Sequence, residues 1–64
     1  MNIDELKAAN KRHRARVAAR FYAAVERANP NMKVTCILMA VGMRMKPKCC
    51  LSTVRRLIEQ AERI

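Results

Sequence analysis

The sequence predicts an all-α fold, in which residues 1–64 form one small domain of three helices. Only one Gly and two Pro occur in 64 residues, which leaves little material for the many turns of a β-protein. Apolar residues make up 52% of the chain and recur mainly at helical spacings. A chain this short buries only about 60% of its unfolded surface, so a homodimer would add to a small core.

Residues 4–28 are expected to form the first helix, since no Pro or Gly interrupts them. Asn29-Pro30-Asn31 ends this helix, because Pro cannot continue it and disfavours helical geometry in the preceding residue. One stripe has the helical spacing of a core face. Its members are Val17, Phe21, Ala24, Val25 and Ala28. The stripe meets polar residues before Val17, so residues 1–16 are expected to project as a basic arm.

Residues 32–44 form the most apolar segment and are expected to be a central helix that the other two bury. Asn31 is a suitable N-cap and Gly42 suits a helix C-terminus. The β-branched residues of the segment leave a strand over 32–45 as an alternative. Its Met residues either fill the core or give an adaptable apolar surface for a partner.

A basic connection over residues 44–48 follows, and Pro47 breaks the chain there. Residues 52–64 are expected to form the third helix, with Ser52 as its N-cap. The apolar positions of this helix give the cleanest amphipathic pattern in the sequence. These positions are Val54, Leu57, Ile58, Ala61 and Ile64.

The charge of the chain indicates a polyanionic partner. Fourteen Lys and Arg against five Asp and Glu give a formal net charge of +9. Such an excess destabilises a compact state through repulsion and is typical of nucleic-acid-binding proteins. The residues expected to contact the nucleic-acid backbone are Lys11, Arg12, Arg16, Arg20, Arg27, Arg44, Lys46 and Lys48.

Four of these cations form an arginine ridge: Arg12, Arg16, Arg20 and Arg27. Their spacing places them within about 80° of one another on a helix, roughly opposite the predicted apolar stripe. Arg suits phosphate because its planar guanidinium donates two parallel hydrogen bonds. The alternative is an ordinary solvated face. Residues 10–16 also resemble the arginine-rich helices of phage antitermination proteins, which implies binding to RNA hairpins.

Met39-Ala40-Val41-Gly42, followed by residues 51–59, resembles the helix-turn-helix of small bacterial and phage transcriptional regulators. The resemblance implies that the last helix reads base edges in the DNA major groove. The side chains that would face DNA are Ser52, Thr53, Arg55 and Arg56. Gly42 and Val54 are twelve residues apart, about twice the family's usual spacing. Either residues 44–49 are an insertion, or the second helix continues past Gly42 and the chain turns at Pro47. An ordinary packing helix over residues 53–64 is the other interpretation.

No enzyme, cofactor or metal site is expected. His13 is the only histidine, and the sequence has no paired carboxylates, phosphate-binding loop or nucleophile–base pair. The cysteines Cys36, Cys49 and Cys50 lack the close pair spacing of a zinc site. Cys36 and Cys50 are expected to be small buried residues in a reduced protein. The alternative is that lysines beside Cys49 and Cys50 lower their pKa values and make them redox-active.

The sequence therefore predicts a DNA-binding transcriptional regulator, with DNA favoured over RNA as its partner. The main alternative is a phage-type regulator that docks on a host transcription protein, RNA polymerase, or on a nuclease. A basic helix lying on a membrane ranks last, because only one Phe and one Tyr are available to insert. No apolar run approaches the roughly 20 residues of a membrane span, and the acidic start has no signal-peptide character. The expected location is the cytoplasm.

Overall fold

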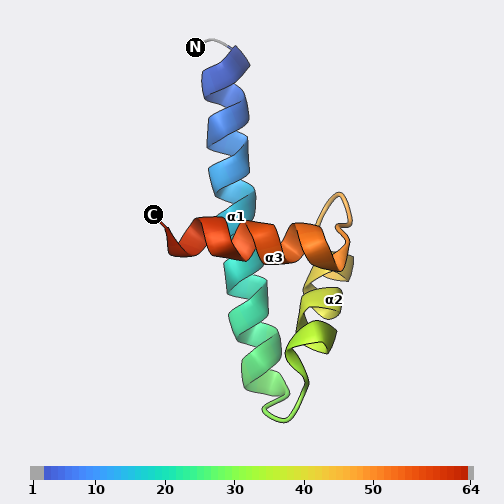
Figure 1. The fold of residues 1–64 in the computed structure, drawn as a ribbon. Helices are drawn as coiled ribbons and strands as arrows, with labels where there is room; N and C mark the ends of the chain where they lie inside the picture. Colours follow the sequence, from blue (N-terminus) through green and yellow to red (C-terminus); the bar gives the residue numbers. More distant parts are fainter. Residues whose placement is uncertain (1–2, 64) are drawn as a thin grey trace.

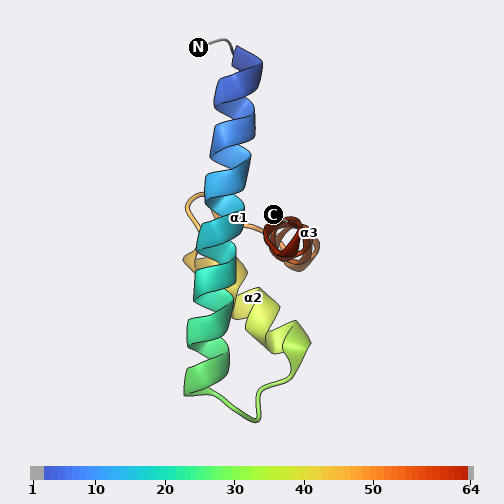
Figure 2. The same ribbon diagram turned by 90° about the vertical axis from the view of Figure 1, so that its left-hand side faces the viewer.

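A computed structural model describes residues 3–63, and its regular elements are three α-helices. They are α1 (Ile3–Ala28), α2 (Val34–Arg44) and α3 (Leu51–Glu62). The all-α prediction is confirmed, and the segment that also permitted a strand is helical. Helix α3 crosses α1 near its middle, and α2 lies beside the C-terminal half of α1 (Figures 1 and 2). The N-terminal half of α1 extends beyond α3.

Small side chains on α1 form the face against which the other helices pack. Ala15 and Ala18 are completely buried and Val25 nearly so. The predicted stripe was placed too far round the helix, because Ala24 and Ala28 are exposed. Side chains as small as these let a neighbouring helix approach closely, and a hydrophobicity pattern gives them little weight.

Helix α2 is buried on one face only. Ile37, Leu38 and Val41 enter the core, at the helical spacing that explains why this segment is a helix. On the other face, Met39 is 55% exposed and Met43 is 70% exposed. The prediction of a helix buried by both neighbours is therefore wrong for this outer face, which the structure leaves apolar and open.

Gly42 marks the closest approach between α2 and the chain that enters α3. Helix α2 continues past Gly42 to Arg44, so this glycine does not end it. A Cβ at this position would overlap the carbonyl oxygen of Cys49 and press on Val54. The Cys49 amide also donates to the Gly42 carbonyl oxygen at 3.1 Å. The long spacing between Gly42 and Val54 therefore arises because α2 continues past Gly42 and the chain turns around Pro47.

Helix α3 packs through the expected positions. Val54 and Leu57 are buried, and Ile58 and Ala61 are half-buried; Ile64 lies outside the described residues. The predicted N-caps are wrong by two residues each, because Lys33 and Cys50 occupy the cap positions instead of Asn31 and Ser52. Between α2 and α3, Met45 is 3% exposed and ties the connection to the core. In the part of the chain described, no helix combines the length and apolar character needed to cross a bilayer.

Candidate nucleic-acid interface

Two hollows on the surface share the side chain of Arg14. The first, about 360 Å³, lies between α1 and α3 and is lined by Lys7, Asn10, Lys11, Arg14, Thr53, Arg56, Leu57 and Gln60. The second, about 260 Å³, lies between α1 and the end of α2 and is lined by His13, Arg14, Val17, Phe21, Arg44, Met45 and Lys46. No carboxylate belongs to either described lining, so both hollows are sites of positive potential.

Arg14 is fixed in place by the connection between α2 and α3. Its Nη2 donates to Cys49 Sγ at 2.8 Å and makes a longer contact of 3.5 Å with the Pro47 carbonyl oxygen. The side chain is half-buried, and its Nε is buried with no hydrogen-bond acceptor among residues 3–63. These contacts join α1 to the connection and hold one cation at the border of the two hollows.

The start of α3 supplies some, but not all, of the side chains that the helix-turn-helix resemblance places on DNA. Thr53 and Arg56 line the first hollow together with the lysines of α1. Arg55 lies on another flank of α3, where it borders a separate groove with Glu59. Consecutive side chains on a helix point about 100° apart, so Arg55 and Arg56 cannot both point into the first hollow. Ser52 is exposed.

We define the basic face as the cations that line the two hollows: Lys7, Lys11, Arg14, Arg44, Lys46 and Arg56. Of the cations proposed from the sequence for backbone contacts, Lys11, Arg44 and Lys46 lie here. Lys48 is exposed in the connection but belongs to neither described lining. Lys7 and Arg14 also lie here, although the sequence had not placed them among the backbone contacts. Their spacing with Lys11, at i, i+4 and i+7, is the signal that would have placed all three on one helix face.

The arginine ridge lies on a different side of α1. Arg12, Arg16, Arg20 and Arg27 are all exposed. Arg16 follows Lys7 by nine residues, which is about two and a half helical turns and therefore the opposite side of the helix. Arg12 is nearest to α3, where it borders a further hollow together with Lys11 of the basic face, Gln60 and Arg63. The chain thus presents two basic surfaces, which adjoin at the hollow that Lys11 and Arg12 share and lie on opposite sides of α1 at Arg16 and Arg20.

The burial of the cysteines differs from the sequence prediction. Cys36 and Cys50 are exposed, so the prediction that they are buried is wrong. Cys50 Sγ lies 3.2 Å from both Ser52 Oγ and Thr53 Oγ1. The Ser52 hydroxyl, followed by that of Thr53, stabilises the thiolate and lowers the pKa of Cys50 from 9.0 to about 6. Within residues 3–63, no three His, Cys, Asp or Glu side chains lie close enough to share a metal ion.

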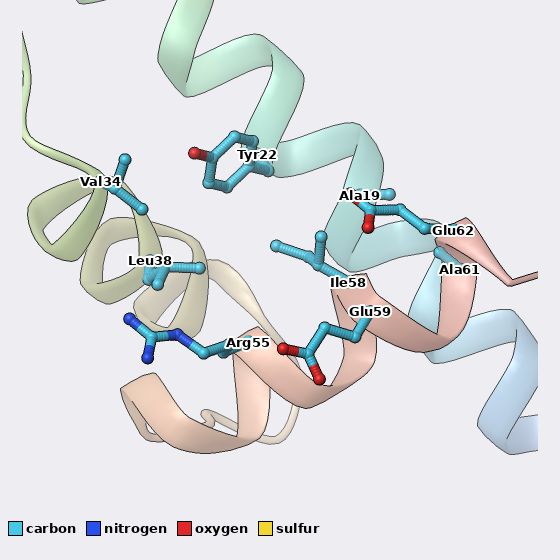
Figure 3. Close-up of a pocket in the computed structure, with 9 residues that line it drawn as sticks. All are labelled: Ala19, Tyr22, Val34, Leu38, Arg55, Ile58, Glu59, Ala61 and Glu62. Atoms are coloured by element: carbon cyan, nitrogen blue, oxygen red, sulfur yellow. The ribbon is translucent and has the colours of Figure 1, made fainter.

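An apolar groove of about 400 Å³ runs between the three helices on another side of α3. Figure 3 shows Tyr22, Leu38 and Ile58 around its floor, with Arg55 and Glu59 at its edge. Val34, at the start of α2, also lines it and is 56% exposed. The mixed charge at this edge makes the groove unlike the basic face, and it is better suited to an apolar partner than to a polyanion.

The chain matches no protein-family model, no curated protein and no solved structure. The resemblances to helix-turn-helix regulators and to antitermination helices therefore remain predictions from short motifs. The geometry of the basic face is the stronger guide to function.

Proposed function

We propose that this protein binds nucleic acid through the basic face and acts as a non-catalytic regulator of transcription, with duplex DNA as its partner. The observation that carries the proposal is the pair of hollows that meet at Arg14, lined by cations from α1, α2, α3 and the connection and by no described carboxylate. A phosphate in either hollow would contact cations from two elements at once. Such contacts fix the register of a protein on a duplex.

Different parts of the interface have different roles in this proposal. Lys7, Lys11 and Arg14 would bind phosphates, which gives affinity that depends on salt but little on sequence. Thr53 and Arg56, at the start of α3, would reach base edges, where an Arg donates to guanine O6 and N7. Arg55 has no role in this interface, because it borders the apolar groove instead.

The first test is electrophoretic binding of the purified protein to duplex DNA, hairpin RNA and single strands across a salt series. We expect the tightest binding to duplex DNA, with affinity falling steeply as salt rises. Selection from a random duplex library then asks whether a sequence is preferred. An enriched motif supports base reading by α3, whereas tight binding without any enriched motif would reduce the role of α3 to phosphate contact.

A second candidate function rests on the apolar surface of the molecule. Met39 and Met43 are exposed on α2, and the groove beside Tyr22 is open. These features favour docking on a protein, such as the host RNA polymerase or nuclease that a phage-type inhibitor covers. A pulldown from host lysate separates the two functions, because a protein complex survives nuclease treatment and a nucleic-acid complex does not. A stoichiometric nuclease-resistant complex, with no preferred DNA sequence, would favour docking.

A further inference from the structure

The cations of α1 point to two opposite sides of the helix. Lys7 and Arg16 are nine residues apart, as are Lys11 and Arg20, and nine residues are about two and a half turns. All four side chains are exposed, but the lysines line the hollow against α3, and neither arginine belongs to its lining. Each pair therefore has one cation on the basic face and one on the arginine ridge.

One nucleic-acid segment cannot easily use both surfaces. A helix that enters a major groove can contact the phosphates of both DNA strands only if both of its sides are free of other protein segments. At the level of Arg16 and Arg20, the opposite side of α1 is closed by the core, because Ala15 and Ala18 are completely buried there. A segment seated on the basic face lies against α3, and the width of α1, about 10–12 Å with its side chains, separates that segment from Arg16 and Arg20.

The ridge has the length and charge to hold a segment of its own. From Arg12 to Arg27 is fifteen residues, or about 22 Å of helix, over which one DNA strand carries about six phosphates. No acidic residue occurs between Leu6 and Val25, so no neighbour on this part of α1 competes for Arg12, Arg16 and Arg20, whereas Arg27 is adjacent to Glu26. The alternative of a solvated face usually mixes charges of both signs.

We propose that the protein holds two nucleic-acid segments together, one on the basic face and one on the arginine ridge. This bridging activity rests on the proposed function, since it requires that the basic face binds nucleic acid. The net charge of +9 offsets part of the repulsion between two segments, and salt screens the remainder within about 8 Å at 0.15 M.

A capture assay tests the bridge. Beads carry one duplex, and a labelled second duplex of unrelated sequence is added with the protein. Three variants each lose two positive charges: R16A/R20A on the ridge, K7A/R56A on the basic face, and K33A/R55A outside both. All six side chains are exposed, so each variant should fold, which far-UV circular dichroism checks. Binding to a single labelled duplex is measured separately for every protein.

We expect the wild-type protein and K33A/R55A to capture the second duplex. R16A/R20A and K7A/R56A should each still bind a single duplex, while their capture falls about tenfold or more as phosphate contacts are lost on one side. Capture by R16A/R20A at the wild-type level would overturn the bridge, and so would an equal loss in K33A/R55A, which would make capture an effect of net charge. Binding of one duplex without capture by the wild-type protein also overturns the bridge but leaves the proposed function intact. Failure to bind even one duplex would overturn both.

Discussion

Replacing Gly42 with Ala should destabilise the protein, although helix propensity alone predicts the opposite. Gly42 lies inside α2, where Ala is favoured over Gly by about 1 kcal/mol. The added Cβ would overlap the Cys49 carbonyl oxygen and approach Val54 to 3.3 Å. Overpacking of this kind costs about 1–3 kcal/mol, and loss of the Cys49–Gly42 hydrogen bond costs about 1 kcal/mol more. Because the overlapping atom belongs to the backbone, a side-chain rotation cannot relieve the contact. The net loss should be about 1–3 kcal/mol.

Thermal unfolding, followed by far-UV circular dichroism, measures this effect. A loss of about 1–3 kcal/mol lowers Tm by roughly 5–20 °C in a domain of this size. The matched control is Met43→Ala, at the next position of the same helix, where the side chain is 70% exposed. This control should change stability by no more than about 0.5 kcal/mol. A Gly42→Ala variant that is as stable as the wild-type protein, or more stable, would refute the close approach of α2 to the start of α3.

Three further predictions follow from the structure. The rate at which iodoacetamide alkylates Cys50 should rise with pH through about 6 and then level off, because the thiolate is the reactive form. A rate that still rises tenfold per pH unit near pH 8 would contradict the lowered pKa. Leu57→Ala should lower the free energy of unfolding, measured in urea, by about 2–5 kcal/mol, and Phe21→Ala should lower it by less, because Leu57 is buried and Phe21 is half-buried. Equal losses in the two variants would contradict this description of the core. Arg56→Ala should weaken DNA binding by about 1–3 kcal/mol and Arg55→Ala much less, and a reversed order in electrophoretic assays would remove α3's proposed role.

The fold could largely be predicted from the sequence, because the signals that define its helices are local. The absence of Pro and Gly in residues 4–28 and the spacing of Val54, Leu57 and Ile58 predict helices close to α1 and α3. The packing of the helices against one another was harder to predict. Ala15 and Ala18 carry a weak hydrophobic signal, yet they are the most deeply buried described residues of α1. Which face of a long helix is buried depends on where a later helix crosses it, and this tertiary information is not present in the periodicity of α1.

The candidate interface was predicted only in part. Net charge and the arginine spacing identified basic surfaces, and both are properties of composition and helix geometry. Arg14 is one of the polar residues that the predicted apolar stripe meets before Val17, and its role could not be predicted, because its contact with Cys49 joins residues 35 positions apart in the chain. The divergence of Arg55 and Arg56 likewise depends on which face of α3 packs inward. Gly42 was expected to end a helix, and only the path of the connection shows that it is needed for close packing.

The most direct test of the basic face is the slope of log binding constant against log salt concentration for duplex DNA, compared between the wild-type protein and K7A/K11A/R56A. If the six cations of the basic face each neutralise a phosphate, the wild-type slope should be about −5, with about a thousandfold loss of affinity between 50 and 200 mM salt. The variant, which keeps three of these cations, should have a slope about 3 units shallower. An unchanged slope in a folded variant would show that these residues do not contact nucleic acid and would contradict the account.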